Sequence, residues 1–163
     1  MTSESNFREA RITMGLRSDF YFTAARERIQ EAHFLHNNGY YTLAMYVSGL
    51  AVECMLRAFR LLKDSTFDER HDLWLLWKST ELANVHSKFY RAKIQAMLSV
   101  VVKLWSNDYR FRSKTELRVY LKKLGRNRGI KGDFLKFNSE EIFRAAAEII
   151  RLGAGLWISL KTK

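Results

Sequence analysis

The chain has 163 residues, which is enough for one domain with a substantial hydrophobic core but too few for two domains of ordinary size. Hydrophobic residues make up 47% and charged residues 28%, which excludes a disordered chain, and the absence of proline suits long helices. The single cysteine, Cys54, excludes an internal disulfide and indicates a cytoplasmic protein. We expect neither a secretion signal nor a membrane span, because no segment approaches the roughly 20 apolar residues that a span needs.

The first helix is expected from about Asp19 to Asn38, after a flexible segment over residues 1–17, with Ser18 as its N-cap. Apolar residues at helical spacing predict its buried face: Phe22, Ala25, Ile29, Ala32, and Leu35 or His36. The Asn37-Asn38-Gly39 sequence ends this helix, because glycine adopts the left-handed conformation that a helix C-terminus favours. The chain is therefore expected to fold back antiparallel at this point.

The stretch from Gly39 to Leu62 is expected to form the central helix, with the other helices packed around it. One row of residues recurs at steps of three and four: Leu43, Val47, Leu50, Cys54, Ala58 and Leu61. A second row lies beside it: Ala44, Ser48, Ala51, Met55 and Phe59. A helix that is apolar over so wide an arc has to be covered from more than one side.

The middle of the chain is expected to hold a short helix and then a third long helix. Thr66 and Glu69 have capping-box spacing for the short helix. Its core contacts are expected to come from Leu73, Leu76 and Trp77. The long helix is expected from about Glu81 to Trp105, with this buried stripe: Leu82, Val85, Phe89, Ile94, Met97, Leu98, Val101 and Leu104.

The C-terminal part begins with a cleaner capping box, from Ser113 to Glu116, for a short helix that ends before Gly125. The inward face of this helix consists of Leu117, Tyr120, Leu121 and Leu124. The last helix is expected to open at Asn138, with close packing at Gly153 and Gly155, and to bury Ile142, Ala145, Ala146, Ile149, Leu152 and Leu156.

These patterns together predict an all-α protein. The expected architecture is an antiparallel up-and-down helical bundle of about four to five helices with one short extra basic helix. We expect a single domain over residues 18–163, with a basic insertion at residues 112–137.

The net charge of +11 is concentrated in one short block. Residues 108–136 contain ten Lys or Arg and three Asp or Glu, so this block carries +7 of the total. On a nucleic-acid backbone such cations release counterions, and rings stack bases. The rings available nearby are Tyr109, Phe111, Phe134 and Phe137. The pattern favours a nucleic acid or a nucleotide, and the alternatives are a solvated basic face and an acidic protein partner.

Three stretches carry a family resemblance: NNGYYTLAMYVSGLAVECMLRAF, RHDLWLL and LWSNDYRF, followed by a final amphipathic helix. In this order, over about Asp19 to Trp157, they resemble the HEPN domain, the higher eukaryote and prokaryote nucleotide-binding fold. The resemblance implies an all-α bundle, usually dimeric, from a prokaryotic toxin–antitoxin, defence or RNA-processing system. Many members are metal-independent endoribonucleases, and others are non-catalytic and bind nucleotide, RNA or protein.

The catalytic members share an Arg that is followed, after four to six residues, by a His near the start of the last long helix. This sequence departs from that pattern, because no histidine follows Arg110 and the last one is His86. The stretch Arg126-Asn127-Arg128 resembles the opening of the motif, but Gly132 and Asp133 stand where a His is expected. The resemblance therefore does not by itself imply ribonuclease activity here.

Glu53 is a carboxylate in the middle of the central helix, and it needs a cation if it is buried. We expect a structural ion pair with Arg110, which the resemblance places opposite this helix, and Arg57 is the local alternative. His71 and Asp72 either serve in general acid–base chemistry or cap a helix and lock a loop onto the bundle.

Three hypotheses for function follow. The leading one is a non-catalytic HEPN-like module that binds RNA or a nucleotide through Arg110, Arg112, Arg118, Lys122, Lys123, Arg126, Arg128 and Lys131. The rival is a metal-independent endoribonuclease with a non-standard catalytic set, which would be His71, Asp72 and Arg110. The third is a protein-interaction module whose basic loop binds an acidic partner such as an antitoxin.

We also expect a homodimer, with a nucleotidyltransferase as a further candidate partner. No cofactor is expected. His33 and His36 share a helical face, but no further metal ligands are visible nearby, so no metal site is predicted.

Overall fold

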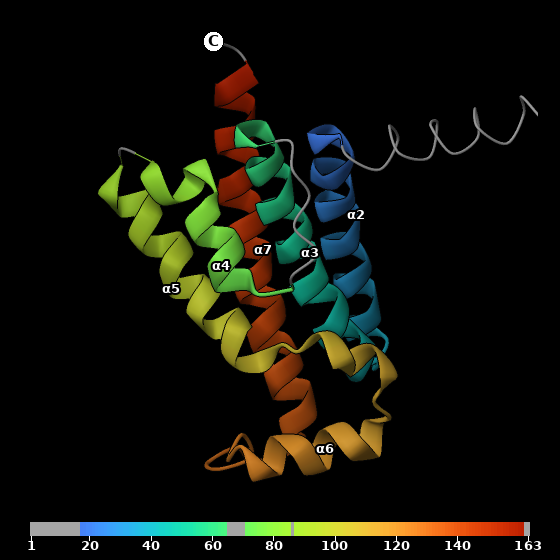
Figure 1. Cartoon of the computed structure of the whole chain (residues 1–163). Helices are drawn as coiled ribbons and strands as arrows, with labels where there is room; N and C mark the ends of the chain where they lie inside the picture. Colours follow the sequence, from blue (N-terminus) through green and yellow to red (C-terminus); the bar gives the residue numbers. More distant parts are fainter. Residues whose placement is uncertain (1–16, 65–70, 86, 162–163) are drawn as a thin grey trace, which may run out of the picture.

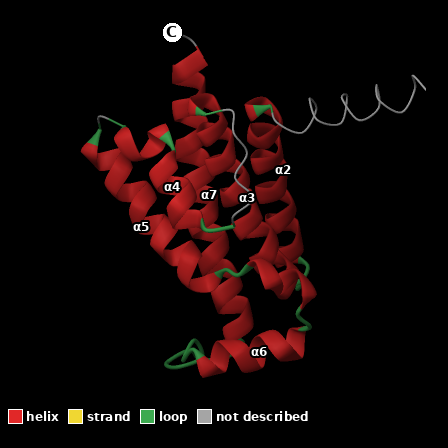
Figure 2. Cartoon of the chain, viewed as in Figure 1, coloured by secondary structure: helices red, strands yellow, loops and turns green. Residues whose placement is uncertain are grey.

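The computed structural model describes residues 17–64, 71–85 and 87–161. These residues form helices joined by turns, without a strand (Figure 2). In chain order the helices are α2 (Ser18–Asn37), α3 (Tyr41–Lys63), α4 (Leu73–Ser79), η1 (Glu81–Asn84), α5 (Lys88–Leu104), η2 (Asn107–Phe111), α6 (Lys114–Lys123) and α7 (Phe134–Lys161). The long helices form a bundle, and α6 lies across one end of it (Figure 1). The prediction of an all-α bundle with one short extra helix is confirmed.

Helices α2 and α3 form an antiparallel hairpin with the boundaries that the sequence indicates to within two residues. Gly39 turns the chain with φ +80°, and its N–H donates to the carbonyl of His36 at 3.1 Å. The expected N-cap, Ser18, is instead the first helical residue, and Arg17 precedes it. The predicted flexible start, apart from Arg17, and the Thr66–Glu69 capping box lie outside the described residues.

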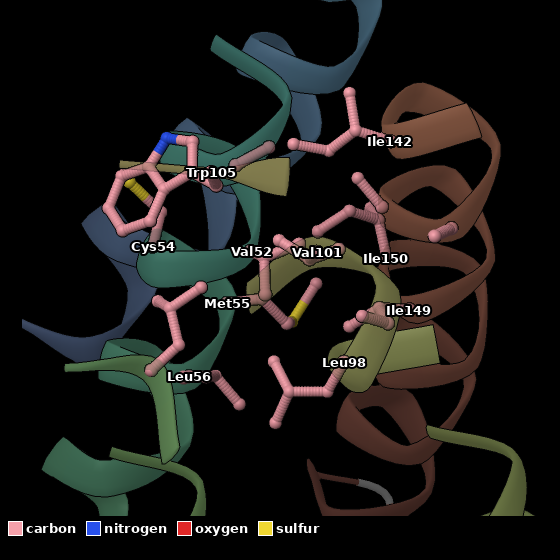
Figure 3. Packing of buried hydrophobic residues seen from close by; sticks show 14 of the residues in the cluster. Val52, Cys54, Met55, Leu56, Leu98, Val101, Trp105, Ile142, Ile149 and Ile150 are labelled. Atoms are coloured by element: carbon pink, nitrogen blue, oxygen red, sulfur yellow. The ribbon is translucent and has the colours of Figure 1, made fainter. Parts of the chain in front are cut away.

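Helix α3 is the centre of the bundle, as predicted, and it contacts α2, α4, α5, α6, α7 and both 3-10 helices. Its better-covered face is the second predicted row, in which Ala44, Ser48, Ala51, Met55 and Phe59 are all buried. In the first row Leu43 is 46% exposed, because that edge of the helix lies at the surface. Figure 3 shows Val52 and Met55 facing the side chains of Leu98 and Ile149.

Helix α3 is also long and apolar enough to cross a membrane by length and composition, contrary to our expectation from the sequence. However, 78% of its most apolar window is buried inside the protein. This burial places α3 in the core of the bundle.

Two glycines allow close helix packing. A Cβ at Gly49 would lie 2.0 Å from Cδ1 of Trp105, whose indole N–H donates to the Tyr46 carbonyl at 3.0 Å. A Cβ at Gly153 would lie 2.9 Å from the sulfur of Met55, so the predicted close contact there is confirmed. At Gly155 no atom lies within 4 Å of such a Cβ, and the same prediction is wrong for this residue.

The predicted third helix, Glu81 to Trp105, is divided into η1 and α5. Val85 has ψ 128°, and the Ser87 hydroxyl then accepts from the Tyr90 N–H at 3.4 Å to start a new helix. The helical phase is not carried across this break. Phe89, predicted to be buried, is therefore 69% exposed, whereas the residues from Ile94 onward face the core as expected.

Helix α7 begins one turn before the predicted Asn138. The Asp133 carboxylate accepts from the N–H groups of Leu135 at 3.0 Å and Lys136 at 3.4 Å, so it caps the helix at an earlier point. Asn138 is buried inside the helix, and its amide donates to the carbonyls of Phe134 and Arg126. The sequence pattern was misread because Asp133 and Asn138 are both good capping residues.

Candidate nucleic-acid interface

Helix α6 presents its cations outward because both its cap and its buried face are strongly specified. The Ser113 hydroxyl accepts from the Glu116 N–H at 3.2 Å, and the Glu116 carboxylate accepts from the Ser113 N–H at 2.8 Å. This is the predicted capping box. Leu117 and Leu121 are buried and hold the helix against the end of the bundle (Figure 1).

Two of the predicted nucleic-acid-binding cations are partly neutralised within the protein. Arg112 donates to one oxygen of Asp108 at 2.9 and 2.7 Å. Arg118 donates to Asp133 at 2.7 Å. A hydrogen bond from Ser106 lowers the pKa of Asp108, and its contact with Arg112 adds to the effect. These cations therefore also serve to hold the segment together.

Aromatic rings contact Arg112 and two cations of α6. The guanidinium of Arg112 lies 4.7 Å from the ring centre of Tyr120. The guanidinium of Arg118 lies 5.1 Å, and the ammonium of Lys122 5.8 Å, from the ring centre of Phe134. Such contacts attract the cation through the negative face of the ring. Of the rings proposed for base stacking, Phe134 is thus buried and already occupied.

The remaining cations are available to a ligand. No described carboxylate forms an ion pair with Arg110, Lys123, Arg126, Arg128 or Lys131. We call these five residues the basic surface. Arg110 lies with its guanidinium 4.6 Å from the ring centre of Phe111, which is itself 77% exposed. Cations and an exposed ring therefore occur together at the end of the bundle that α6 covers.

The turn between α6 and α7 is held in place by hydrogen bonds to both flanking helices. Gly125, Gly129 and Gly132 have φ values of +72°, +72° and +90°, which other residues rarely adopt. The N–H of Arg126 donates to the Leu121 carbonyl at 2.9 Å, and the buried amide of Asn138 donates to the Arg126 carbonyl at 3.0 Å. The turn is thus connected to both flanking helices.

Two hollows lie beside Phe137 in α7, and the first of them also borders this turn. The first, of about 330 Å³, is lined by Gly125, Arg126, Arg128, Gly129, Ile130, Phe137, Asn138 and Glu141. The second, of about 340 Å³, is lined by Phe137, Glu140, Glu141 and Arg144. Phe137 and Glu141 therefore border both. Our sequence reasoning included Phe137 among the available rings but missed Glu141, although the spacing of four residues places both on one face of α7.

Glu53 forms a different ion pair from the one expected. Its carboxylate oxygen Oε1 accepts from Nε of Arg57 at 2.9 Å and lies 2.9 Å from Nδ1 of His71. The Glu53 and Arg57 side chains are buried, whereas that of His71 is 47% exposed. The predicted Glu53–Arg110 pair is therefore wrong. Arg110 is exposed beside Phe111, and the local alternative, Arg57, reaches the carboxylate from one turn away.

The residues of the alternative catalytic set, His71, Asp72 and Arg110, each contact a different partner. Asp72 accepts from the Leu75 N–H at 3.0 Å and caps α4, whereas His71 turns to Glu53. Arg110 has its own contact with Phe111. His71 and Asp72 thus have the structural roles that were weighed as their alternative: the pair caps a helix and joins it to the bundle.

The other candidate groups have contacts of their own: His36 and Cys54 are buried, and His33 is exposed. Nδ1 of His36 lies 2.9 Å from the Ser139 hydroxyl, and the His33 ring stacks on Phe143 at 5.1 Å. In the described ranges no three His, Cys, Asp or Glu residues lie together as metal ligands. Burial raises the pKa of Cys54 to about 11, which keeps it a thiol at neutral pH.

The comparisons with known proteins give one match. Comparison with curated proteins finds none, and comparison with solved structures finds none. A family model described as the HEPN domain matches residues 18–151, from the start of α2 through most of α7. The resemblance inferred from the three sequence stretches is thereby confirmed. This protein belongs to the HEPN domain family.

Proposed function

We propose that this protein is a non-catalytic HEPN module that binds RNA or a nucleotide through the basic surface. HEPN domains have RNA- or nucleotide-related functions, often in toxin or defence systems, and often form dimers. The observation that carries the proposal is the set of five cations without an ion pair to a described carboxylate, beside the exposed rings of Phe111 and Phe137. Arg126 is half-buried and the other four cations are exposed. Phosphates bind such cations, and bases stack on such rings.

The position of the histidines supports the non-catalytic part of this proposal. The chain has no histidine after His86, so η2, α6 and α7 contain none. Proton transfer during RNA cleavage commonly uses an imidazole within hydrogen-bond reach of the ribose hydroxyl or the leaving oxygen. The basic surface has cations for the phosphate but no imidazole for this step.

The cellular setting belongs to the same proposal. We place the protein in the cytoplasm, as a homodimer, within a prokaryotic toxin–antitoxin, defence or RNA-processing system. An acidic antitoxin or a nucleotidyltransferase is the candidate protein partner. Support comes from the family and from the net charge of +11.

Binding to RNA at two salt concentrations tests the proposal. With a fluorescent single-stranded RNA, five phosphate contacts predict an affinity loss of about 100-fold between 50 and 200 mM salt. The triple variant Arg126→Gln, Arg128→Gln, Lys131→Gln should bind more weakly and have a shallower salt dependence. Its matched control removes three cations from α4 and α5, namely Lys78, Lys88 and Arg91, and should bind nearly as wild type. Absent binding, or binding indifferent to salt, contradicts the proposal.

A second candidate, an endoribonuclease that uses His71, is favoured by one observation. The buried Glu53 carboxylate holds Nδ1 of His71, and the imidazole is half exposed, as in a general base oriented by a carboxylate. Incubation of a mixed RNA pool with wild type and with His71→Ala separates the candidates. Equal survival of the RNA with both proteins excludes this activity, whereas cleavage by wild type alone excludes the non-catalytic proposal.

A further inference from the structure

Phe137 is an exposed aromatic ring between two hollows. It lies in the first turns of α7, is 52% exposed, and borders both the hollow of Arg126 and Arg128 and the hollow of Glu140 and Arg144. Single exposed rings are common on protein surfaces and need no explanation. This ring differs because open space lies beside it in two places and charged groups surround it.

The cations next to this ring are held in place by the backbone. The amide of Asn138, the residue after Phe137, is buried and donates to the carbonyl of Arg126. The N–H of Arg128 donates to the Gly125 carbonyl at 3.2 Å, and the Arg128 side chain lies against Gly125. Both guanidinium-bearing residues therefore lie in a turn that is fixed to the same helix as the ring.

Two glutamates, Glu140 and Glu141, lie beside the hollows that Phe137 borders. Glu140 is paired with Arg144, whereas Glu141 has no ion pair with a described cation and borders both hollows. A carboxylate repels phosphate but accepts hydrogen bonds from the N–H groups of a base. A strand that crosses Phe137 would thus place its phosphates near Arg126 and Arg128 and a base edge near Glu141.

We propose that Phe137 is a stacking platform for one unpaired base of a single-stranded RNA, with the adjacent phosphate bound by Arg126 and Arg128. This inference rests on the proposed function and narrows its ligand. A volume of about 330 Å³ is at the small end for ligand sites and suits one nucleotide rather than a cofactor. In a duplex the faces of a base are covered by its neighbours, so a stacking platform selects single strands.

Three variants test this inference by fluorescence anisotropy with a 12-nucleotide single-stranded RNA and with the same sequence in a duplex. Phe137→Leu, which removes the ring, should weaken single-strand binding about tenfold. Phe137→Tyr, which keeps the ring, should bind as wild type. Phe89→Leu is the matched control, because Phe89 is an exposed ring on α5 beside Lys93. It should leave affinity unchanged.

A base analogue reports the stacking directly. A single 2-aminopurine in the RNA should change its fluorescence on binding to wild type and to Phe137→Tyr, but not on binding to Phe137→Leu. Equal affinity of wild type and Phe137→Leu, with salt-dependent binding intact, overturns this inference and leaves the proposed function standing. Equal affinity for duplex and single strand overturns it as well. If wild type binds no RNA at all, the proposed function fails, and the stacking site fails with it.

Discussion

Glu53 lies in the middle of the central helix, and Nδ1 of His71 is 2.9 Å from its Oε1 and 3.1 Å from its Oε2. The two residues are 18 positions apart in the chain. Arg57 completes the cluster from the next turn of α3, with its Nη2 2.9 Å from Oε1 of Glu53. A buried carboxylate is costly without such partners, and here the partners also attach the start of α4 to α3.

Removal of Glu53 should be far more damaging than removal of His71. Glu53→Ala removes the buried carboxylate that both Arg57 and His71 contact and should lower the free energy of unfolding by about 3–5 kcal/mol. His71→Ala removes a half-exposed group and should cost about 1 kcal/mol. Urea denaturation followed by circular dichroism measures both.

A double variant provides the control for that comparison. Replacement of both Glu53 and Arg57 by leucine removes the charges together, so it should cost less than Glu53→Ala alone. A double variant at least as unstable as Glu53→Ala would show that the loss of the Glu53–Arg57 charge balance is not the cause.

Two glycine substitutions should have opposite effects on stability. Gly49→Ala places a methyl group 2.0 Å from the Trp105 ring and should cost about 1–3 kcal/mol, because the indole has to move away from the Tyr46 carbonyl. Gly155→Ala meets no atom within 4 Å and should stabilise α7 by up to about 1 kcal/mol. Thermal melts of the two variants measure the difference, and a neutral Gly49→Ala would disprove the close packing.

The buried amide of Asn138 should hold the turn between α6 and α7 in place. Asn138→Ala removes the hydrogen bonds to the carbonyls of Phe134 and Arg126, which should cost about 1–3 kcal/mol. Amide hydrogen exchange should accelerate over residues 125–131. RNA affinity should fall together with it, because Arg126 and Arg128 are then no longer held beside Phe137. Unchanged exchange in the turn would mean that the Asn138 bond does not anchor it.

Stability should decrease as the pH falls through the titration range of histidine. Burial lowers the pKa of His36 below its usual 6.5, while Glu140 acts to raise it and Lys136 and His33 to lower it. Well above pH 6.5 the imidazole is neutral in both states and contributes no pH dependence. Below it the unfolded chain takes up a proton that the folded protein resists, so the free energy of unfolding drops.

Urea denaturation at pH 7.5 and pH 5.5 measures this effect. His36→Gln should show a smaller drop than wild type between these two values. Contacts with Arg151 and Lys93 lower the pKa of Glu148 to about 2 from its usual 4.5, so its contribution is lost only below about pH 4.5 and does not interfere. A drop of equal size in both proteins would assign the effect to other groups.

The sequence by itself determined the helices that are specified by local signals. The Ser113–Glu116 cap, the turn at Gly39 and the apolar arc of α3 each depend on residues within one or two turns of one another. Such interactions form in the same way whatever the rest of the chain does. These signals were therefore sufficient for the fold class, the central helix and the position of the basic helix.

Only the tertiary structure decided which distant groups meet. Arg57, Arg110 and His71 are all chemically suitable partners for Glu53. Arg57 lies one turn away on the same helix, whereas the packing of α4 on α3 decides that His71, and not Arg110, also reaches the carboxylate. Likewise, the hollow that Phe137 shares with Arg126 and Arg128 depends on how the turn between α6 and α7 folds against α7. Side-chain chemistry limits the possible partners, but their selection depends on contacts between segments that local spacing does not specify.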